Sequence, residues 1–321
     1  MDINNVTKYN DAAGICQKAY MYIKDLILSG ERDITKLCEM GDAYIRDKLT
    51  CVYKKETCKG LYLPVCISFS NCVGYNCTDP FTDTDIVKIE LGVEIGECKC
   101  TLGETFNITN GDDMYIKLLD ELQKIVIQNM TTEHNNFDVK IEVESKCTEH
   151  NCFPMENCTS YQYVPDNTPE IDVPKYIVLN HKKYYDDNDF LTVNPNLCFD
   201  FCEGEVYHIN LTIVQDSTES SSHKFIQKPA DILRFNDLYY SLKLKNSKQF
   251  CHKVKSVNRT NAFRLQDYVT TPNDRMGMKE CIDSGILDSY IKYYTKDNCP
   301  VYIKKFTVYI HNGKAKLVKY K

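Results

Sequence analysis

The chain has few glycines and no long apolar stretch. Only 13 of its 321 residues are glycine, which leaves little material for a glycine-rich phosphate-binding loop, and the sequence contains no such motif. No apolar run approaches the roughly 20 residues that a helix needs to cross a bilayer. The first residues, Met1-Asp2-Ile3-Asn4-Asn5, lack the basic and apolar segments of a signal peptide. We therefore expect neither a membrane partner nor export.

Histidine is also scarce, and its seven copies are scattered. None of them forms a recognisable nucleophile motif with a cysteine or a serine. The chain has 17 cysteines but no CxxC pair, and an odd count without an export signal predicts free thiols in the cytoplasm. The spacing of Cys147, His150, Cys152 and Cys158 leaves a structural zinc site open as an alternative.

The stretch from Asp85 to Phe106 predicts a β-hairpin. Apolar residues alternate with Lys88, Glu90 and Gly92, which is the period of a half-buried strand. Gly96 can adopt the positive φ that a tight reversal needs, so a second strand would return from Cys98 to Phe106. Acidic side chains on paired strands could hold a metal, or could lie on a solvated edge.

The remaining patterns predict an α+β fold, because helices and antiparallel strands alternate along the chain. Helices are expected at residues 11–29, 33–49 and 112–126 and over most of 225–294. Strands are expected at residues 60–70, 137–143, 205–214, 301–310 and 315–320, with an irregular stretch at 144–197. This order suggests one domain of two related halves.

The overall charge of −6 conceals a basic final third. Residues 223–321 carry 20 Lys and Arg against 8 Asp and Glu. The densest basic cluster consists of Lys243, Lys245, Lys248, Lys253, Lys255, Arg259 and Arg264. Such a cluster is typical of a surface that binds nucleic-acid phosphates, although a solvated helical face gives the same pattern.

Several short segments together resemble one known family. They are Val6-Thr-Lys-Tyr9, Leu37-Cys-Glu-Met-Gly-Asp42, Asn71-Cys-Val73, Val87-Lys-Ile-Glu-Leu-Gly-Val93, Arg275-Met-Gly-Met-Lys-Glu-Cys281 and Lys305-Phe-Thr-Val308 followed by Asn312-Gly313. In order and spacing they resemble the type II methionine aminopeptidases, and within them the non-catalytic proliferation-associated (ErbB-receptor-binding) branch. The resemblance implies a pita-bread (creatinase/aminopeptidase-like) fold, with pseudo-symmetric halves, antiparallel sheet flanked by helices, in a single domain over residues 1–321. A helical type II insertion would occupy residues 217–294.

The peptidases of this family hold two metal ions with two Asp, one His and two Glu, and place a further His near the substrate. Carboxylate and imidazole groups suit divalent ions that activate water. The corresponding positions here are Glu90, Lys99 or a neighbour, Cys158 within a residue or two, Asn210 and Lys305, with Tyr75 at the substrate-side position. One carboxylate among five positions predicts a degenerate site without metal, cofactor or peptidase activity.

The resemblance implies a protein that binds the large ribosomal subunit near the peptide exit tunnel. Its partners would be rRNA and the proteins of the tunnel rim, and it would act as a monomer without a small-molecule substrate, in the cytoplasm and also in the nucleus or nucleolus. The basic cluster would contact rRNA phosphates. Two alternatives stay open: an active metal-dependent methionine aminopeptidase, and a protein-interaction regulator that does not bind RNA. Roles in subunit assembly, nuclear export and translation are all compatible with these residues.

Overall fold

The computed structural model describes residues 3–75, 82, 86–109, 111–156, 158–164, 175–180, 198–215, 225–236, 238–296 and 298–319. Its centre is an antiparallel nine-stranded sheet with the strand order β1-β3-β4-β12-β8-β6-β7, in which β13 pairs with β12 and β5 pairs with β8. These strands are β1 (Lys59–Phe69), β3 (Ile86–Ile95), β4 (Cys98–Asn107), β5 (Cys152–Pro154), β6 (Ser160–Tyr163), β7 (Tyr176–Ile177), β8 (Val206–Gln215), β12 (Val301–His311) and β13 (Lys314–Leu317).

The two hairpins predicted from the sequence are confirmed. Strands β3 and β4 pair in a continuous register from Ile86↔Asn107 to Ile95↔Cys98. Gly96 closes this hairpin with a φ of 63°, a conformation that a residue with a Cβ adopts only at a cost. The closing hairpin of β12 and β13 turns at Asn312-Gly313, where both residues also have positive φ.

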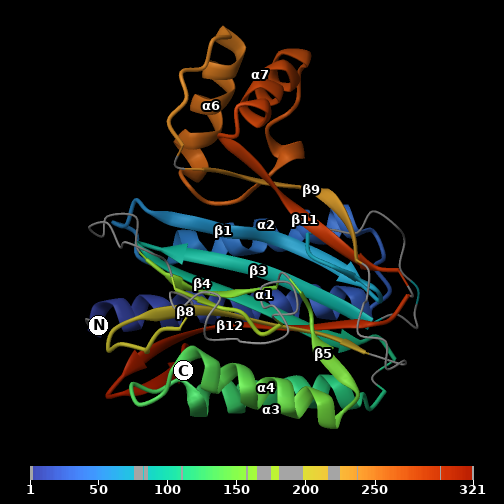
Figure 1. Cartoon of the computed structure of the whole chain (residues 1–321). Coiled ribbons are helices and arrows are strands. Elements are labelled where there is room, and N and C mark those ends of the chain that lie inside the picture. The colour runs from blue at the N-terminus through green and yellow to red at the C-terminus, as the bar shows by residue number, and fades with distance from the viewer. Residues whose placement is uncertain are drawn as a thin grey trace.

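Four helices cover one face of the main sheet (Figure 1). They are α1 (Ile3–Leu28), α2 (Ile34–Cys51), α3 (Met114–Asn129) and α4 (Asn136–Glu149). Helices α1 and α2 pack on β1, β3 and β4, and α3 packs on β8 and β12 with α4 beside it. Ile89, Leu91 and Val93 lie in the core beneath α1 and α2. Because side chains alternate along a strand, Glu90 and Glu94 point to the opposite face.

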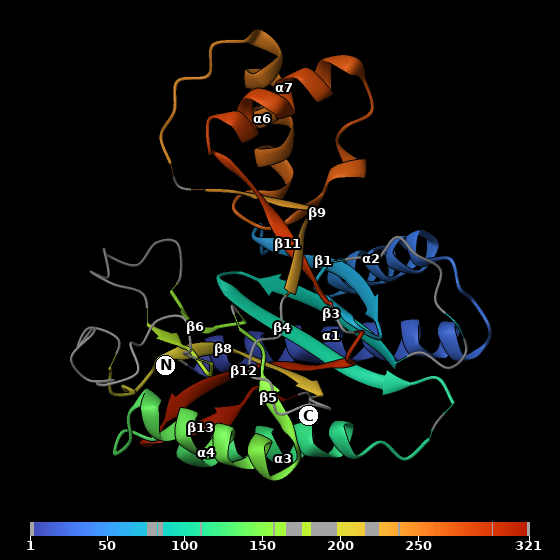
Figure 2. The same cartoon turned by 45° about the vertical axis from the view of Figure 1, so that its right-hand side comes forward.

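A smaller unit stands on that opposite face (Figure 2). It comprises β9 (Phe225–Phe235), α6 (Lys245–Asn258), β10 (Phe263–Arg264), the 3₁₀ turn η2 (Leu265–Asp267), α7 (Pro272–Asp283) and β11 (Leu287–Thr295). We call these residues, 225–295, the insertion. Its sheet has the order β10-β9-β11-β2, and β2 (Cys72–Val73) comes from the first half of the chain. The insertion is therefore joined to the body by strand pairing.

Two buried carboxylates of the body also hold the insertion. Asp42 of α2 accepts hydrogen bonds from the backbone N–H of Val65, at 2.7 Å, and from the guanidinium of Arg264, at 3.0 Å. Glu94 of β3 accepts hydrogen bonds from Asn261, at 2.6 Å, and from Arg259, at 3.3 Å. Burial raises the pKa of Asp42, and the Arg264 charge opposes this rise. Each carboxylate thus has a cationic partner from the insertion.

The strand predicted at residues 137–143 is wrong, because this segment is the helix α4 (Asn136–Glu149). Asn135 and Asp138 form a capping box, in which each side chain bonds the other's backbone N–H. Val139, Val143 and Cys147 are buried at helical spacing, whereas Ile141 is 59% exposed. The apolar residues at every second position fit a strand equally well, and the cap determines the outcome.

The prediction that residues 225–294 are helical is only partly right. The segment begins and ends with the paired strands β9 and β11, and only α6 and α7 between them are α-helical. Residues 217–224, at the start of the expected insertion, lie outside the described residues. Within the stretch 144–197, expected to be irregular, the described parts contain the end of α4 and the strands β5, β6 and β7. No helix among the described residues is long and apolar enough to cross a membrane.

Candidate functional site

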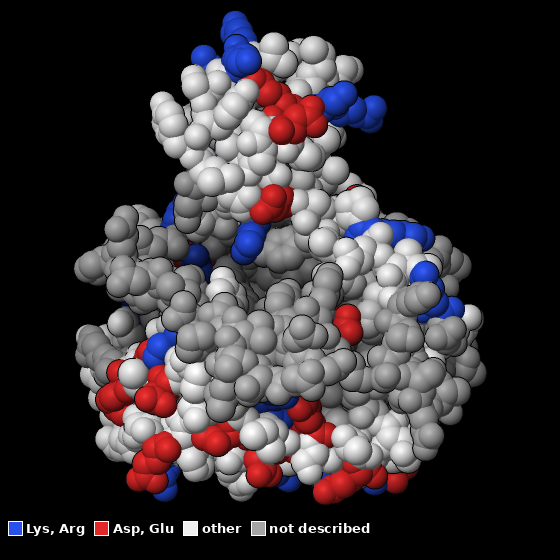
Figure 3. All heavy atoms as spheres, viewed as in Figure 1, with Lys and Arg blue, Asp and Glu red and all other residues white. Residues whose placement is uncertain are grey.

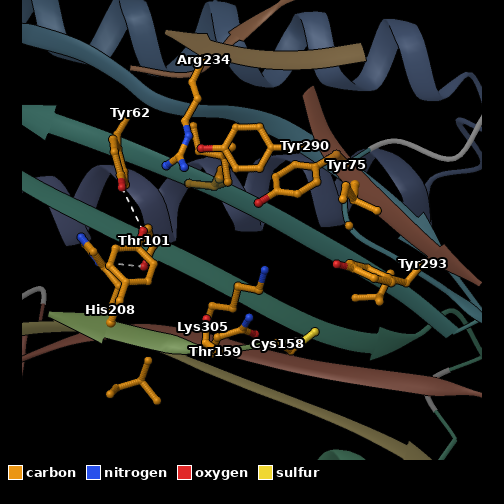
Figure 4. A pocket seen from close by; sticks show the side chains of 18 of the residues that line it. Tyr62, Tyr75, Thr101, Cys158, Thr159, His208, Arg234, Tyr290, Tyr293 and Lys305 are labelled. Carbon is orange, nitrogen blue, oxygen red and sulfur yellow. Dashed lines mark hydrogen bonds between the residues drawn. The ribbon is translucent and has the colours of Figure 1, made fainter. Parts of the chain in front are cut away.

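A pocket of about 620 Å³ lies between the open face of the main sheet and the strands of the insertion. Figure 3 shows a hollow at this junction. The floor comes from β4, β8 and β12, and the roof comes from β9 and β11 (Figure 4). The polar and aromatic residues lining it are Tyr62, Tyr75, Thr101, Cys158, Thr159, Tyr161, Tyr176, His208, Asn210, Arg234, Asp288, Ser289, Tyr290, Tyr293 and Lys305.

One row of residues crosses the main sheet at the pocket floor. Glu90 of β3 pairs with Gly103 of β4, Gly103 with Lys305 of β12, and Lys305 with Asn210 of β8. Neighbours in such a row point to the same face of the sheet. Thus three positions predicted by the resemblance, Glu90, Asn210 and Lys305, do lie together, and Cys158 and Tyr75 line the same pocket.

The centre of this row is an ion pair. The ammonium of Lys305 donates to the Glu90 carboxylate at 2.5 Å, and the Glu90 side chain is 1% exposed. Burial alone would lower the pKa of Lys305, but the carboxylate of Glu90 raises it above its ordinary value. Gly103 makes this contact possible, because a Cβ there would lie 2.8 Å from the Lys305 side chain. Lysine therefore occupies the space that faces Glu90.

Lys99 does not belong to this row. It pairs with Glu94, its ammonium lies 4.0 Å from the Glu94 carboxylate, and the rings of Tyr62 and Tyr163 are each 5.4 Å from it. The residues of β4 that line the pocket are Thr101 and Leu102, two and three positions further on. Register between the strands, which the sequence does not reveal, decides which residue of β4 faces the pocket.

His208 is a pocket residue that the sequence analysis missed. Its Nδ1 lies 3.2 Å from Thr101 Oγ1 and 3.1 Å from Thr307 Oγ1. The rings of Tyr62 and Tyr161 pack against the imidazole. Burial, with a smaller contribution from the Lys99 charge, lowers the pKa of His208 to about 3, so the ring is neutral at physiological pH. The alternation of β8, which places residues 208 and 210 on one face, was the available signal.

Tyrosines and one arginine form the rest of the pocket wall. Tyr75 has a φ of 47° and its ring centroid is 4.3 Å from that of Tyr290. Tyr62 and Tyr161 share a hydrogen bond of 2.9 Å between their hydroxyl groups. Arg234 of β9 lies with its guanidinium carbon 5.6 Å from the centre of the Tyr290 ring. Burial raises the pKa of Tyr290 to about 12, so this wall keeps its phenolic protons at neutral pH.

These residues do not fit a dinuclear metal centre. The only carboxylate of the row is ion-paired with an ammonium group at 2.5 Å, and a positive charge at that position repels a divalent cation. Gly103 offers no side chain, and Asn210 contributes only a neutral amide. A water-activating pair of ions needs several anionic ligands at closely set distances. Among the described residues, no cluster of three His, Cys, Asp or Glu is arranged to hold a metal.

The alternative zinc site near Cys147 is also not assembled. Cys147 and Cys152 lie in the core under α3 and α4, where the Cys152 thiol lies 3.4 Å from the carbonyl oxygen of Cys147. His150 bonds the carbonyl of Lys146 instead. Cys158 lines the pocket on the other face of the sheet, where burial raises its pKa to about 11.

Some residues of the basic cluster are exposed, and others are engaged in ion pairs or hydrogen bonds within the protein. Lys243, Lys245, Lys248, Lys253 and Lys255 are exposed. Arg264 is 3% exposed and ion-paired with Asp42, so it cannot contact RNA as predicted. Arg259 bonds Glu94, and Lys253 bonds the Tyr268 carbonyl and lies 3.5 Å from Asp274. Lys245 begins α6 and Lys243 precedes it, so the two do not share a strand face.

Comparison with known proteins agrees with this fold. No family model matches the chain. It is 24% identical over 331 residues to ErbB-3 binding protein 1 of Arabidopsis thaliana, covering 98% of this chain and 80% of the relative. It is 26% identical over 325 residues to the Solanum tuberosum protein of the same name, covering 94% and 78%. Proliferation-associated protein A of Dictyostelium discoideum is 23% identical over 336 residues, covering 99% and 83%.

Solved structures show the same architecture. A thermophilic Arx1 superimposes with a TM-score of 0.81 at 19% identity, covering all of this chain and 92% of that one. A methionine aminopeptidase from Rickettsia prowazekii superimposes with a TM-score of 0.57 at 12% identity, covering 99% and 98%. The expected pita-bread fold is confirmed, and over nearly its whole length the chain is similar in sequence to proteins named ErbB-3 binding protein 1 and proliferation-associated protein A.

Proposed function

We propose that this protein is a non-catalytic relative of the methionine aminopeptidases that docks on the large ribosomal subunit near the peptide exit tunnel. The proposal follows from its homology to proliferation-associated proteins and from the residues at the pocket floor. The observation that carries the non-catalytic part is the ion pair of Lys305 with Glu90, at 2.5 Å. It places an ammonium group where a peptidase would need an anionic ligand.

The docking part rests on four lysines of the insertion. Lys243, Lys245, Lys248 and Lys255 are exposed on or just before α6, and we call them the docking lysines. Figure 3 shows basic side chains at the outer end of the insertion, with acidic groups between them. The first three make no ion pair among the described residues, and the ammonium of Lys255 lies 4.8 Å from the centre of the Phe235 ring. These groups suit contact with rRNA phosphates, which needs charge but no base recognition.

This mode of action requires occupancy alone. The insertion would cover its site on the subunit, and the proteins of the tunnel rim would contact the adjoining surface of the body. Such a protein acts as a monomer, in the cytoplasm and in the nucleus or nucleolus, and needs no cofactor. Subunit assembly, export and translation remain equally compatible roles.

The test is co-sedimentation with purified large ribosomal subunits over a range of salt concentrations. We expect native protein to sediment with the subunit, and its affinity to fall steeply with salt, because each phosphate contact adds about one unit to the slope of log affinity against log salt. Changing all four docking lysines to Glu should abolish binding at physiological salt. The fold should be retained, because these side chains are exposed.

The matched control changes Lys54, Lys55, Lys124 and Lys316 to Glu. These four lysines are exposed on the body, so the control has the same net charge as the first variant. It should keep native binding. If the two variants bind alike, the docking surface lies elsewhere. Association that does not respond to salt would support the alternative of a protein-interaction regulator without RNA contact.

A further inference from the structure

We propose that the pocket between the main sheet and the insertion binds the carboxylate end of a peptide whose last side chain is apolar or aromatic. This inference goes beyond the proposed function and does not rest on it. The cavity of about 620 Å³ is within the size range of pockets that hold small ligands. Its lining determines which ligand chemistry it accepts.

Two cationic side chains enter the pocket from opposite sides. In Figure 4, Arg234 descends from β9 in the roof and Lys305 rises from β12 in the floor. The ammonium group of Lys305 has three protons, of which the hydrogen bond to Glu90 uses one. Arg234 makes no ion pair among the described residues, and its guanidinium lies beside the Tyr290 ring. A carboxylate between these groups would gain two charge-assisted hydrogen-bond donors.

The neighbouring walls favour an aromatic or apolar side chain next to that carboxylate. Tyr75 and Tyr290 form a tilted pair with ring centroids 4.3 Å apart, and Tyr293 stands beside them in Figure 4. Val73 and Ile291 add aliphatic surface to the same lining. Aromatic pairs of this kind bury much of the surface of a third ring placed against them.

The polarity of the pocket is opposite to what a free amino terminus needs. An incoming ammonium group would meet the positive charges of Lys305 and Arg234, because the carboxylate of Glu90 is buried and already bonded to Lys305. Among the described residues, the one acidic side chain in the lining is that of Asp288, the cross-strand neighbour of Arg234. Its carboxylate can accept the backbone N–H of a peptide, which a simple inorganic anion lacks. The pocket therefore suits a C-terminal peptide end rather than an N-terminal one.

The test measures binding of three tripeptides to the full chain by calorimetry. The first is acetyl-Ala-Leu-Phe with a free carboxylate, the second is the same peptide with a C-terminal amide, and the third has a free amino terminus and a C-terminal amide. We expect saturable binding of the first, at least tenfold weaker binding of the second, and the weakest binding of the third. Arg234→Gln should weaken binding of the first peptide at least tenfold.

The matched control is Arg275→Gln, which removes an exposed arginine of α7 outside the pocket lining and should leave binding unchanged. Lys305→Met is less suitable as a test because it leaves Glu90 buried without its partner. Equal affinity for the carboxylate and amide peptides would overturn the proposal. So would tighter binding of the free-amine peptide, absence of saturable binding at millimolar peptide, or unchanged binding by Arg234→Gln.

Discussion

The Lys305–Glu90 pair is the residue-scale feature with the largest expected effect on stability. Replacing Lys305 by Met leaves the Glu90 carboxylate, which is 1% exposed, without a compensating charge. Removing one partner of a buried ion pair typically costs about 3–5 kcal/mol. We expect a loss of this size in the free energy of unfolding, measured by urea denaturation, and partial recovery in the double variant Glu90→Gln/Lys305→Met.

The neighbouring Lys304 provides the control for this measurement. It points to the other face and pairs with Glu104 and with Asp120, whose side chain is 59% exposed. Lys304 is buried, but the carboxylates that Lys304→Met leaves behind are reached by solvent, since Glu104 is 26% exposed and Glu90 only 1%. Lys304→Met should therefore cost less than Lys305→Met. Equal losses in the free energy of unfolding for the two variants would show that burial of Glu90 adds nothing to the cost of removing its partner.

His208 predicts a dependence of stability on pH. Its pKa is about 3 in the folded protein and about 6.5 in an unfolded chain. Between these values only the unfolded state binds the proton, so stability falls as the pH falls from 6.5 toward 3. The slope contributed by this one group is at most about 1.4 kcal/mol per pH unit.

The measurement compares urea denaturation of native protein and His208→Gln at pH values from 7.5 to 4.5. Carboxylates titrate in part of this range, so the difference between the two proteins carries the information. We expect the substitution to cost less at pH 4.5 than at pH 7.5. The exposed His252 supplies the control, because His252→Gln should keep the pH dependence of the native protein. If His208→Gln lowered the free energy of unfolding by the same amount at every pH, the prediction would be contradicted.

At the scale of elements, the link between α2 and β10 should determine how firmly the insertion is held. Arg264→Met leaves Asp42 buried without its cation and should lower stability by about 3 kcal/mol. Hydrogen exchange of the backbone amides in β10 and β1 should become faster, because these elements meet at this ion pair. Arg275→Met, on the exposed face of α7, should change neither quantity.

Recovery by a second substitution separates the charge from the packing. In Asp42→Asn/Arg264→Met the amide oxygen can still accept the Val65 N–H, and no unpaired charge remains. We expect this double variant to be more stable than Arg264→Met alone. If Arg264→Met matches native protein in both stability and exchange, the ion pair does not hold the insertion.

Elements with a distinctive periodicity or turn could be predicted from the sequence, and ambiguous ones could not. The β3–β4 and β12–β13 hairpins were predicted correctly because Gly96 and Asn312-Gly313 mark their turns. The alternating apolar residues at 137–143 predict a strand, although Asn135 and Asp138 have the spacing of a helix cap. Local capping signals should therefore take priority where the two periods compete.

The site shows the same division. The resemblance groups Glu90, Asn210 and Lys305 at one site, and the pairing of β3, β4, β12 and β8 does place them in one row. The position on β4, expected at Lys99 or a neighbour, stays open in the sequence because the register of β3 against β4 depends on pairing along the whole hairpin. His208 was overlooked because a histidine in a sequence gives no sign of its burial. The roof residue Arg234 lies in a segment expected to be helical, which concealed its position opposite Lys305.

For the whole molecule, we expect no divalent metal in the pocket and no peptidase activity. The full chain is incubated with Mn²⁺ or Co²⁺, freed of unbound ions by gel filtration and examined by elemental analysis. Less than a tenth of an equivalent should remain, because the donor row holds one ion-paired carboxylate. Methionine should not be released from a Met-Ala-Ser peptide.

If metal is retained, the variant Glu90→Gln shows whether it is bound in the pocket. Metal that persists in this variant lies outside the pocket, and metal lost with Glu90 would contradict the expected absence. Release of methionine that also disappears with Glu90 would restore the alternative of an active aminopeptidase.

The buried ion pairs of the insertion bear on the distance between its far end and the pocket. Asp42 and Glu94 hold Arg264 and Arg259 at the base of the insertion, and α6 runs from this base to the far end of the insertion (Figure 1). We expect these two ion pairs, together with the pairing of β11 with β2, to restrain the insertion from swinging on the body. If the lysines of α6 contact a partner surface, the distance from that surface to the mouth of the pocket should then stay constant. A distance held in this way would set how long a tethered chain must be to run from that surface into the pocket.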